Sequence, residues 1–452
     1  MSSRLQRIAD AVERTPLLRE EGKVTRVIGL VVEGFGRGAF VGELCHIESI
    51  TSGWIPAEVV GFRDERILLM PFGSADGVGM GCRIRPSGQS VRVSVGPQLL
   101  GRVLDGLGQP LDGRPLEHLE TTRSLHAEPL NPMLRKPIEE PLDIGISVLN
   151  GLLTIGKGQR VGIMAGSGVG KSVLLGMMAR NVQADVSVIA LIGERGREVR
   201  DFIDNILGPG GLARSVVVCA TSDQGPLIRM RGAYLATTIA EYFREQGQDV
   251  LMVMDSVTRF AMAQREIGLA IGEPPATKGY TPSVFATLPK LLERAGNDGG
   301  EGSLTAFYTV LVEGDDMQDP IGDATRGILD GHIVLSRDLA GRGHYPAVDV
   351  LGSASRVMSA VTTPEHREIA LKARRLIADY KEAEDLINIG AYQHGSNPKV
   401  DEAIARNEAI TAVLQQLSDQ NMHMDETLKR LKTAAQGPIP NGRAKPRVKE
   451  RR

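Results

Sequence analysis

The chain has 452 residues, of which 42% are apolar, and this is enough for about three domains with buried cores. Its 53 basic and 55 acidic side chains nearly cancel, which excludes a strong overall attraction to nucleic acid or to an anionic membrane surface. The sequence contains no uncharged apolar run near the ~18 residues of a membrane span. Cys45, Cys82 and Cys219 follow no metal-binding spacing, so we expect them to be small buried side chains in a reducing cytoplasm.

The first predicted element is a short amphipathic helix within residues 1–20. Apolar side chains recur at helical spacing in residues 4–14, and charged side chains occupy the other face. Such a helix either packs on the body of the protein or docks on a partner or a membrane surface. Residues 21–95 then alternate short β-rich runs with Gly and Pro, which predicts a small all-β barrel or sandwich. The clearest of these runs are residues 24–32, 67–70 and 91–95.

A larger α/β domain is predicted for residues 96–360. It begins with a Pro- and Gly-rich connecting segment, residues 96–140, that contains a few short strands. Apolar strand runs then alternate with amphipathic helices over residues 141–355, a pattern typical of a parallel sheet covered by helices. The predicted strands are residues 160–164, 186–192, 215–219, 250–254, 304–312 and 331–335, of which we expect the last to end the sheet.

The C-terminal part of the chain is predicted to be a helical domain, residues 361–436. Its expected helices are residues 365–379, 401–418 and 424–435. Residues 437–452 are rich in Lys and Arg and broken by Pro, which predicts a disordered basic tail.

The sequence AGSGVGKS, residues 165–172, follows a predicted strand and opens a predicted helix. A Gly-rich turn in this position points successive backbone N–H groups at a phosphate, at the positive end of the helix. Lys171 can then reach the β- and γ-phosphates of a nucleoside triphosphate, and the Ser172 hydroxyl can bind Mg²⁺. Ala165 replaces the first Gly of the strict pattern, and a chance Gly-rich turn is the alternative. The predicted nucleotide ligands are Gly166, Ser167, Gly168, Val169, Gly170, Lys171 and Ser172.

Two further strands end in carboxylates that are expected at the same edge of the sheet. Asp255 directly follows an apolar strand and can hold Mg²⁺, although a helix N-cap, for which Ser256 serves equally well, is the alternative. Glu194 follows the strand 186–192 and is our candidate for the base that orients water. Glu198 is a second candidate for the base, and Arg195 is expected to contact the terminal phosphate.

Tyr345 and Arg356 lie in a Gly-rich region near the end of the α/β domain. An aromatic face can stack on adenine, and an Arg from a neighbouring subunit can stabilise charge on the γ-phosphate. Considered alone, the two positions favour a simpler interpretation, a core tyrosine and a surface arginine.

Taken together and in order, these segments resemble the catalytic subunits of the rotary ATP synthase alpha/beta family. Within that family they are most similar to the flagellar type III protein-export ATPases. The segments that carry the resemblance are AGSGVGKS (165–172), GERGREV (193–199), VLMVMDSVTRFAMAQREIGLAIGEPP (250–275), GYTPSVFATLPKLLERAG (279–296), YPAVDVLGSASRV (345–357) and DLINIGAY (385–392), with weaker similarity in GRVLDGLGQPLDG (101–113).

The resemblance implies a fold and a set of roles. The fold is a P-loop, RecA-like ATPase core with an N-terminal β-barrel and a C-terminal α-helical domain, assembled as a hexameric ring. Glu194 becomes the catalytic carboxylate, Tyr345 the aromatic that stacks on adenine, and Arg356 an arginine finger that acts across a subunit boundary. Lys171 and Arg195 complete the expected catalytic set, with ATP and Mg²⁺ as the bound species.

The resemblance also implies partners and a location. The N-terminal helix would bind a regulatory, stator-like export protein, and the C-terminal domains would contact a coiled-coil stalk protein inside the ring. Chaperone–substrate complexes and membrane proteins of the export gate are further expected partners. The expected location is cytoplasmic, peripherally attached to the inner membrane at the flagellar base.

Three other functions share parts of this pattern. Injectisome secretion ATPases share most of the motifs, and the segments at 256–275 and 382–392 favour the flagellum. A rotary ATP synthase catalytic subunit should carry an acidic DELSEED-type turn, which the sequence after Tyr380 lacks. A hexameric RNA translocase should carry a basic, aromatic-rich module, whereas this chain is 4% aromatic with one Trp, so we expect no nucleic acid partner.

Overall fold

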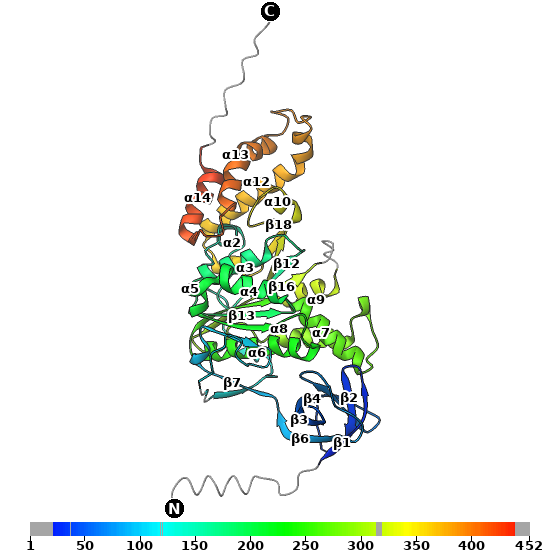
Figure 1. Ribbon diagram of the computed structural model, residues 1–452. Coiled ribbons are helices and arrows are strands. Elements are labelled where there is room, and N and C mark those ends of the chain that lie inside the picture. Colours follow the sequence, from blue (N-terminus) through cyan, green and yellow to red (C-terminus); the bar gives the residue numbers. More distant parts are fainter. Residues whose placement is uncertain (1–20, 37, 118, 120, 313–318, 439–452) are drawn as a thin grey trace, which may run out of the picture.

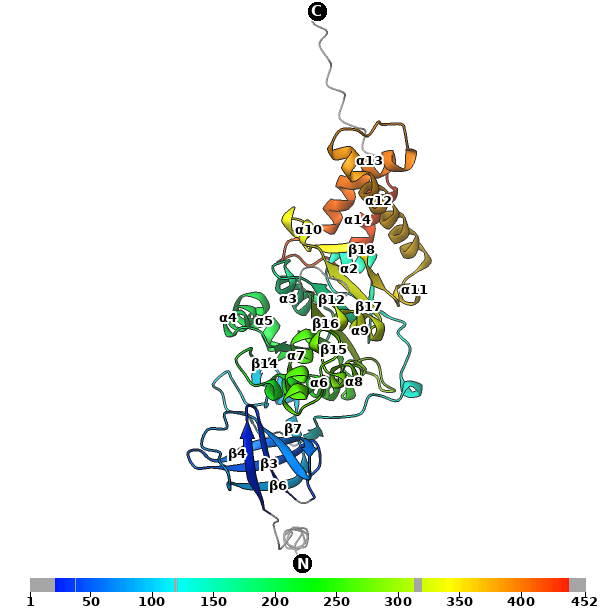
Figure 2. The ribbon, with the colours of Figure 1, turned by 90° about the vertical axis from the view of Figure 1, so that its right-hand side faces the viewer.

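The computed structural model describes residues 21–36, 38–117, 119, 121–312 and 319–438. Three bodies follow one another along the long axis of the molecule: a barrel, an α/β core and a bundle of helices (Figures 1 and 2). The helix predicted within residues 1–20, and residues 439–452 of the predicted tail, lie outside the described residues. None of the helices in these ranges is long and apolar enough to cross a membrane.

The N-terminal body is a closed six-stranded barrel, as predicted for this part of the chain. Side chains of its strands point alternately into and out of the barrel: Cys45 and Ile47 of β3 are fully buried, while the alternate residues Leu44, His46 and Glu48 are partly exposed. The predicted run 24–32 forms two strands rather than one, because Gly29 turns the chain with a φ of 55°. In barrel order the strands are β1 (Gly22–Ile28), β2 (Val31–Phe35), β5 (Arg66–Pro71), β4 (Gly53–Arg63), β3 (Glu43–Ser49) and β6 (Arg83–Ser90).

The core is an eight-stranded sheet whose strands are parallel except at one edge. In sheet order they are β18 (Val348–Ser355), β17 (Gly331–Leu335), β12 (Arg160–Ala165), β16 (Ser303–Leu311), β15 (Asp249–Asp255), β13 (Val186–Ile192), β14 (Ser215–Ala220) and β8 (Arg102–Asp105). Since the parallel strands share one direction, their carboxyl ends form one edge of the sheet and their amino ends form the other. We call these the carboxyl edge and the amino edge.

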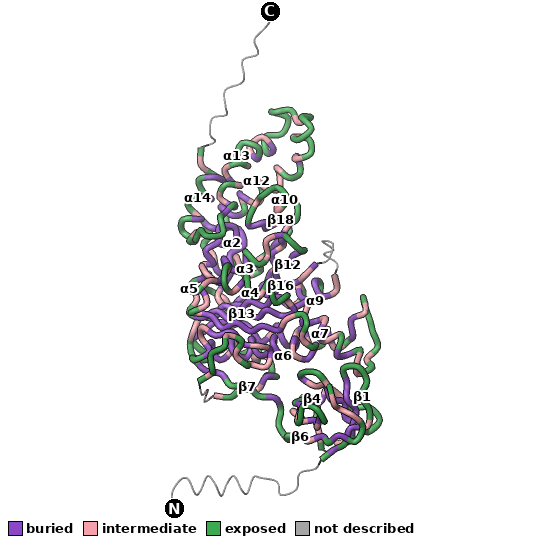
Figure 3. The backbone as a smooth tube through the Cα atoms, in the orientation of Figure 1, coloured by how far each residue is buried: buried purple, intermediate pink, exposed green. Residues whose placement is uncertain are grey.

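Both faces of this sheet are covered, which explains the continuous apolar runs of its strands. Along β13, Val188 and Ile192 belong to the core beneath one set of helices, and Ile189 and Leu191 to the core beneath the other. The central strands are accordingly buried along their length (Figure 3). The first face carries α6 (Pro226–Glu245), α7 (Val257–Ala270) and α8 (Pro282–Leu292), and the second carries α2 (Ser147–Leu152) and α3 (Lys171–Asn181).

Two strands of the core correct the prediction from sequence. The strand 331–335 does not end the sheet, because β18 pairs with it in the antiparallel direction. β8 lies in the segment predicted as a connection and adds a parallel strand beside β14 at the opposite edge. Both are edge strands with polar or small residues, so neither shows the apolar run that marks the central strands.

The third body is helical, as predicted, with shifted boundaries. The first helix extends well past residue 379, and the second ends at Leu414, after which Gln415 adopts an extended conformation. These helices are α12 (Pro364–Asn388), α13 (Pro398–Leu414) and α14 (Met424–Gln436). The remaining short elements are β7 (Arg92–Val95), η1 (Pro97–Leu99), β9 (Thr121–Ser124), η2 (Pro132–Leu134), β10 (Pro141–Leu142), β11 (Ile155–Gly156), α4 (Gly196–Asp201), η3 (Phe202–Leu207), α5 (Gly208–Ala213), η4 (Thr277–Gly279), α9 (Pro320–Ile328), α10 (Arg337–Gly341) and α11 (Met358–Val361).

Candidate active site

The predicted phosphate loop lies at the carboxyl edge, in the middle of the sheet. β12 ends at Ala165 and α3 begins at Lys171, so the loop is the five residues between them, among which are Gly166, Ser167 and Val169. Gly168 and Gly170 have φ angles of 79° and 86°, which a side chain would strain. The loop therefore turns directly into the N-terminus of α3, where backbone N–H groups and the helix dipole favour an anion.

Lys171 lies between two carboxylates that come from other strands. Its Nζ is 2.5 Å from Oδ1 of Asp255, which ends β15, and 3.5 Å from Oε1 of Glu194, which follows β13. The side chains are 12%, 4% and 16% exposed, respectively, so the cluster is shielded from water. Thr309 of β16 donates a hydrogen bond of 2.7 Å to the same Asp255 oxygen. One cation and two carboxylates from three elements thus meet at the carboxyl edge.

Glu194 is held in place by the residues that surround it. The preceding Gly193 has a φ of 71°, and a Cβ there would lie 2.7 Å from side-chain carbons of Arg259. The Glu194 carbonyl accepts a hydrogen bond from the Ser222 amide. Burial, together with the negative charge of Asp255, raises the pKa of Glu194 to about 7 despite the nearby ammonium of Lys171. A carboxyl group with this pKa can exchange protons near neutral pH.

Arg195 and Glu198 lie at the surface beside this cluster. The Arg195 side chain is 82% exposed and forms an ion pair of 3.3 Å with Glu198. Glu198 in turn hydrogen-bonds to Glu194 and contributes to the rise in the pKa of that group. Ser172, the second residue of α3, is exposed beside Lys171. Of the predicted site residues at this edge, Asp255 is therefore buried and Lys171 and Glu194 are mostly buried, whereas Ser172 and Arg195 are exposed.

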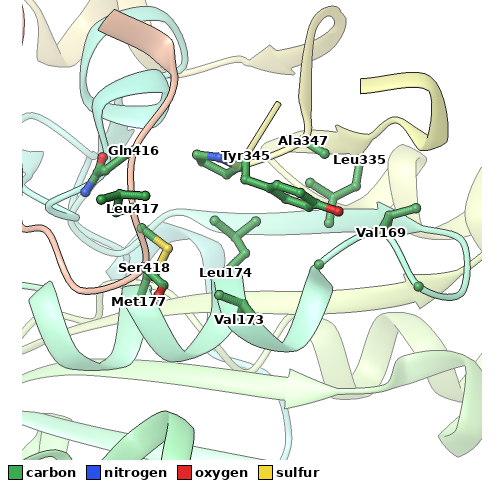
Figure 4. A pocket seen from close by; sticks show the side chains of 13 residues that line it. Val169, Val173, Leu174, Met177, Leu335, Tyr345, Ala347, Gln416, Leu417 and Ser418 are labelled. Carbon is green, nitrogen blue, oxygen red and sulfur yellow. The ribbon is translucent and has the colours of Figure 1, made fainter. Parts of the chain in front are cut away.

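Tyr345 lies over the phosphate loop, in a largely apolar cavity of about 420 Å³ (Figure 4). A Cβ on Gly170 would approach the Tyr345 ring to 3.2 Å, so the glycine permits this close packing. The other wall comes from the segment between α13 and α14, where Gln416 donates a backbone hydrogen bond of 2.9 Å to the Tyr345 carbonyl. The lining residues are Gly168, Val169, Gly170, Val173, Leu174, Met177, Leu335, Tyr345, Pro346, Ala347, Gln416, Leu417 and Ser418.

Arg356 lies away from the phosphate loop of its own chain. It follows β18, and because β18 is antiparallel to β17, Ser355 pairs with Gly331 at the start of β17. Arg356 therefore lies at the amino edge, whereas the Lys171 cluster lies at the carboxyl edge. Its side chain is exposed, and one guanidinium N–H donates to the Arg326 carbonyl at 3.1 Å.

Several residues of the site were not predicted from sequence. Thr309 had a detectable signal, since it is a polar residue near the carboxyl end of an otherwise apolar predicted strand. Arg259 and Leu417 had none, because Arg259 packs beside Gly193 from a helix farther along the chain and Leu417 comes from the C-terminal body.

The fold and the site define a P-loop ATPase with a RecA-like core. Residues 145–355 match the nucleotide-binding domain of the ATP synthase alpha/beta family, and residues 24–88 match the beta-barrel domain of that family. Residues 362–433 match the T3SS EscN ATPase C-terminal domain.

Known proteins place the chain within that class. It is 54% identical to the flagellum-specific ATP synthase of Bacillus subtilis (strain 168), over 94% of this chain and 97% of the relative. The assembled type III secretion ATPase EscN from enteropathogenic E. coli superposes with a TM-score of 0.87 at 46% identity, covering 92% of this chain and all of EscN. EscN in complex with its central stalk EscO superposes with a TM-score of 0.85 at 45% identity, with the same coverage. The chain belongs to the ATP synthase alpha/beta family, and it is an ATPase.

Proposed function

We propose that this protein hydrolyses ATP to energise flagellar type III protein export, preparing substrates for the export gate by releasing them from chaperones and unfolding them. The observation that carries the proposal is the mostly buried Lys171, held between Asp255 and Glu194 beside a phosphate loop. This cluster supplies a phosphate-binding cation, a metal-binding carboxylate and a base at one edge of a sheet, as phosphoryl transfer to water requires.

ATP binds with its phosphates on residues 166–172 and its adenine against Tyr345. The backbone N–H groups of the loop and Lys171 neutralise the phosphates, while the apolar cavity beneath the Tyr345 ring accepts the base. Leu417 closes that cavity from the C-terminal body, so bound nucleotide would join two bodies of the chain.

Mg²⁺ fits the donor atoms that the carboxyl edge provides. Asp255 and Ser172 offer a carboxylate and a hydroxyl, and oxygen is the ligand that Mg²⁺ prefers. When bound with ATP, the ion would neutralise charge on the β- and γ-phosphates.

Glu194 orients the attacking water and accepts its proton. The pKa of this carboxyl group, about 7, matches a base that works near neutral pH. Arg195 begins from a surface position, so its contact with the terminal phosphate requires the side chain to leave its pairing with Glu198.

The catalytic unit is a ring in which Arg356 serves the site of the next subunit. Within one chain, Arg356 and the phosphate loop lie at opposite edges of the sheet, so the arginine cannot complete its own site. A hexameric ring brings the amino edge of one subunit to the carboxyl edge of the next. The assembled state of EscN supports this arrangement.

The proposal includes further partners, of which a relative supports one. EscN binds a central stalk, EscO, which supports a coiled-coil stalk protein as a partner inside the ring of this ATPase. We assign residues 1–20 to a stator-like regulator, and place the ring in the cytoplasm against the inner membrane at the flagellar base, beside the export gate and its chaperone–substrate complexes. The proposed domain boundaries are 21–95, 96–360 and 361–436, with a basic tail at 437–452.

Genetic complementation tests the function. A Bacillus subtilis strain that lacks its flagellum-specific ATP synthase should regain motility with this chain, since the two are 54% identical over 94% of it. The Lys171→Ala variant, expressed at the same level, should not restore it. If this chain restores no motility but does restore secretion to a strain lacking EscN, the injectisome is its system and the flagellar assignment is wrong.

A further inference from the structure

Gln159 is a fully buried amide at the amino edge, directly before β12 begins. Burying an amide costs free energy unless its donors and acceptor are satisfied. The chemistry proposed above gives this residue no role, although it lies beneath the strand that leads to Arg356.

Each polar atom of the Gln159 side chain has a partner. Its Oε1 accepts the N–H of Gly156 at 2.9 Å. Its Nε2 donates to the Asp330 carbonyl at 3.1 Å and to the Ser355 Oγ at 3.2 Å. A backbone N–H can only donate, so the contact with Gly156 fixes which end of the amide is the oxygen.

The two groups that Gln159 contacts both lie next to the Arg356 backbone. Ser355 precedes Arg356 in the chain, and the Asp330 carbonyl also accepts the Arg356 backbone N–H at 3.0 Å. Asp330 is itself fixed, because Arg160 donates to its two carboxylate oxygens at 2.9 and 3.0 Å. Gln159 thus ties together the two groups next to the Arg356 backbone, in addition to the hydrogen bond from Ser355 Oγ to the Thr154 carbonyl and the pairing of Ser355 with Gly331.

We propose that Gln159 is the positioning residue for Arg356, and that it fixes the arginine that each subunit lends to its neighbour. The proposal rests on the role of Arg356 across the subunit boundary. Misplacing a catalytic group by about 1 Å can cost about 10²-fold in rate, and loss of the Gln159 anchor permits a shift of that size.

The position of Gln159 also predicts which subunit's active site loses activity when Gln159 is replaced. The phosphate loop of the same chain follows the other end of β12, which is about 20 Å away for a strand of six residues. Replacing Gln159 should therefore leave the nucleotide site of its own subunit intact and weaken the site of the next one.

Mixed rings test this prediction. Gln159→Leu should lower kcat for ATP by about 10²-fold in pure rings, with KM nearly unchanged. Mixing it with Lys171→Ala should restore activity, because some sites then combine an intact phosphate loop with a well-placed Arg356. Mixing it with Arg356→Ala should restore almost nothing, because no site receives a well-placed arginine.

The opposite pattern, recovery with Arg356→Ala and none with Lys171→Ala, overturns the proposal, since it would place the defect in the variant's own phosphate loop. An unchanged kcat also overturns it. Lys171→Ala mixed with Arg356→Ala is the reference: its failure to recover activity, although rings form, refutes the trans role of Arg356 and this proposal with it. Recovery in the reference but not with Gln159→Leu refutes only the role of Gln159.

Two further variants distinguish the proposed role of Gln159 from a general folding defect. Ser355→Ala removes one partner of Gln159 and leaves the amide in place, so it should show the same mixing pattern with a smaller loss. Ser187→Ala is the matched control, because Ser187 is a buried polar residue near the amino edge of β13, and four strands lie between β13 and β18. Loss of activity in Ser187→Ala to the same degree would contradict the specific role of Gln159.

Discussion

The two edges of the central sheet differ in the completeness of their chemistry. At the carboxyl edge, a mostly buried lysine contacts two carboxylates and lies beside a phosphate loop, so the groups proposed to act on a nucleotide are assembled within one chain. At the amino edge, the Arg356 side chain is exposed and donates a hydrogen bond to the Arg326 carbonyl, while buried groups hold its backbone in place.

This contrast has a physical meaning. An exposed arginine contributes little to the stability of its own subunit, since solvent screens its charge. Buried hydrogen bonds to its backbone nevertheless fix the position of the side chain, which matters where that side chain must contact a partner in a fixed geometry. Under the proposed function, the difference between the edges means that a subunit is complete as a nucleotide-binding unit and incomplete as a catalyst.

The largest expected effect is the loss of Arg356. Arg356→Ala should lower hydrolysis by about 10³–10⁵-fold, the range for arginine fingers, and still bind ATP. Lys171→Ala should instead weaken binding as well as hydrolysis. Measuring nucleotide binding by fluorescence and hydrolysis by steady-state kinetics distinguishes a defect at the amino edge from one at the carboxyl edge.

The specific activity of the unaltered protein should also rise with its concentration as rings form. A specific activity that stays constant across that concentration range contradicts a site shared between subunits.

Replacing Glu194 should have the next largest effect and should remain confined to the carboxyl edge. Glu194→Gln keeps the shape of the side chain and removes its basicity, so we expect retained ATP binding and a rate lowered by about 10²–10⁴-fold. Glu198→Gln is the matched control, because Glu198 is the more exposed carboxylate beside it. If Glu194→Gln hydrolyses ATP rapidly and Glu198→Gln does not, the base is Glu198.

The pH dependence of kcat/KM should report the same carboxyl group. Glu194 has a pKa of about 7 and acts as a carboxylate, so activity should rise with pH and level off above that value. Below it, protonation should remove about tenfold in kcat/KM for each pH unit. Glu198→Gln removes a neighbour that raises this pKa, so its midpoint should move to lower pH. A midpoint near 4.5 in the unaltered protein, the ordinary value for Glu, contradicts the assignment.

The sequence predicted the carboxyl edge better than the amino edge, and the reason lies in which residues build each. β13 has its predicted bounds, 186–192, because its run of buried apolar residues faces helices on both sides. Phosphate loops and strand-end carboxylates are local patterns, so Lys171, Asp255 and Glu194 could be proposed from position alone. The roles of those residues remain predictions.

The amino edge depends on contacts that no local pattern encodes. β18 contains Gly352 and Ser353 in place of an apolar run, and it is recognisable only by its pairing with β17. Gln159 has no sequence signal, because its two donors meet groups far along the chain. The sequence also does not predict the cavity wall at Leu417, because the predicted helix runs through residue 418, whereas α13 ends at Leu414.

The smallest expected effect concerns the cavity where the carboxyl edge meets the C-terminal body. Tyr345→Ala removes the ring over Gly170, and we expect a loss of about 1 kcal/mol in nucleotide binding, a roughly fivefold rise in KM with kcat little changed. Tyr345→Phe keeps the ring and should behave like the unaltered protein. Leu417→Ala should raise KM by less than Tyr345→Ala, because it removes apolar area from the cavity wall and leaves the ring in place. If KM for ATP is the same in all three variants, adenine does not bind in this cavity, and the pocket at the junction of the two bodies serves another purpose.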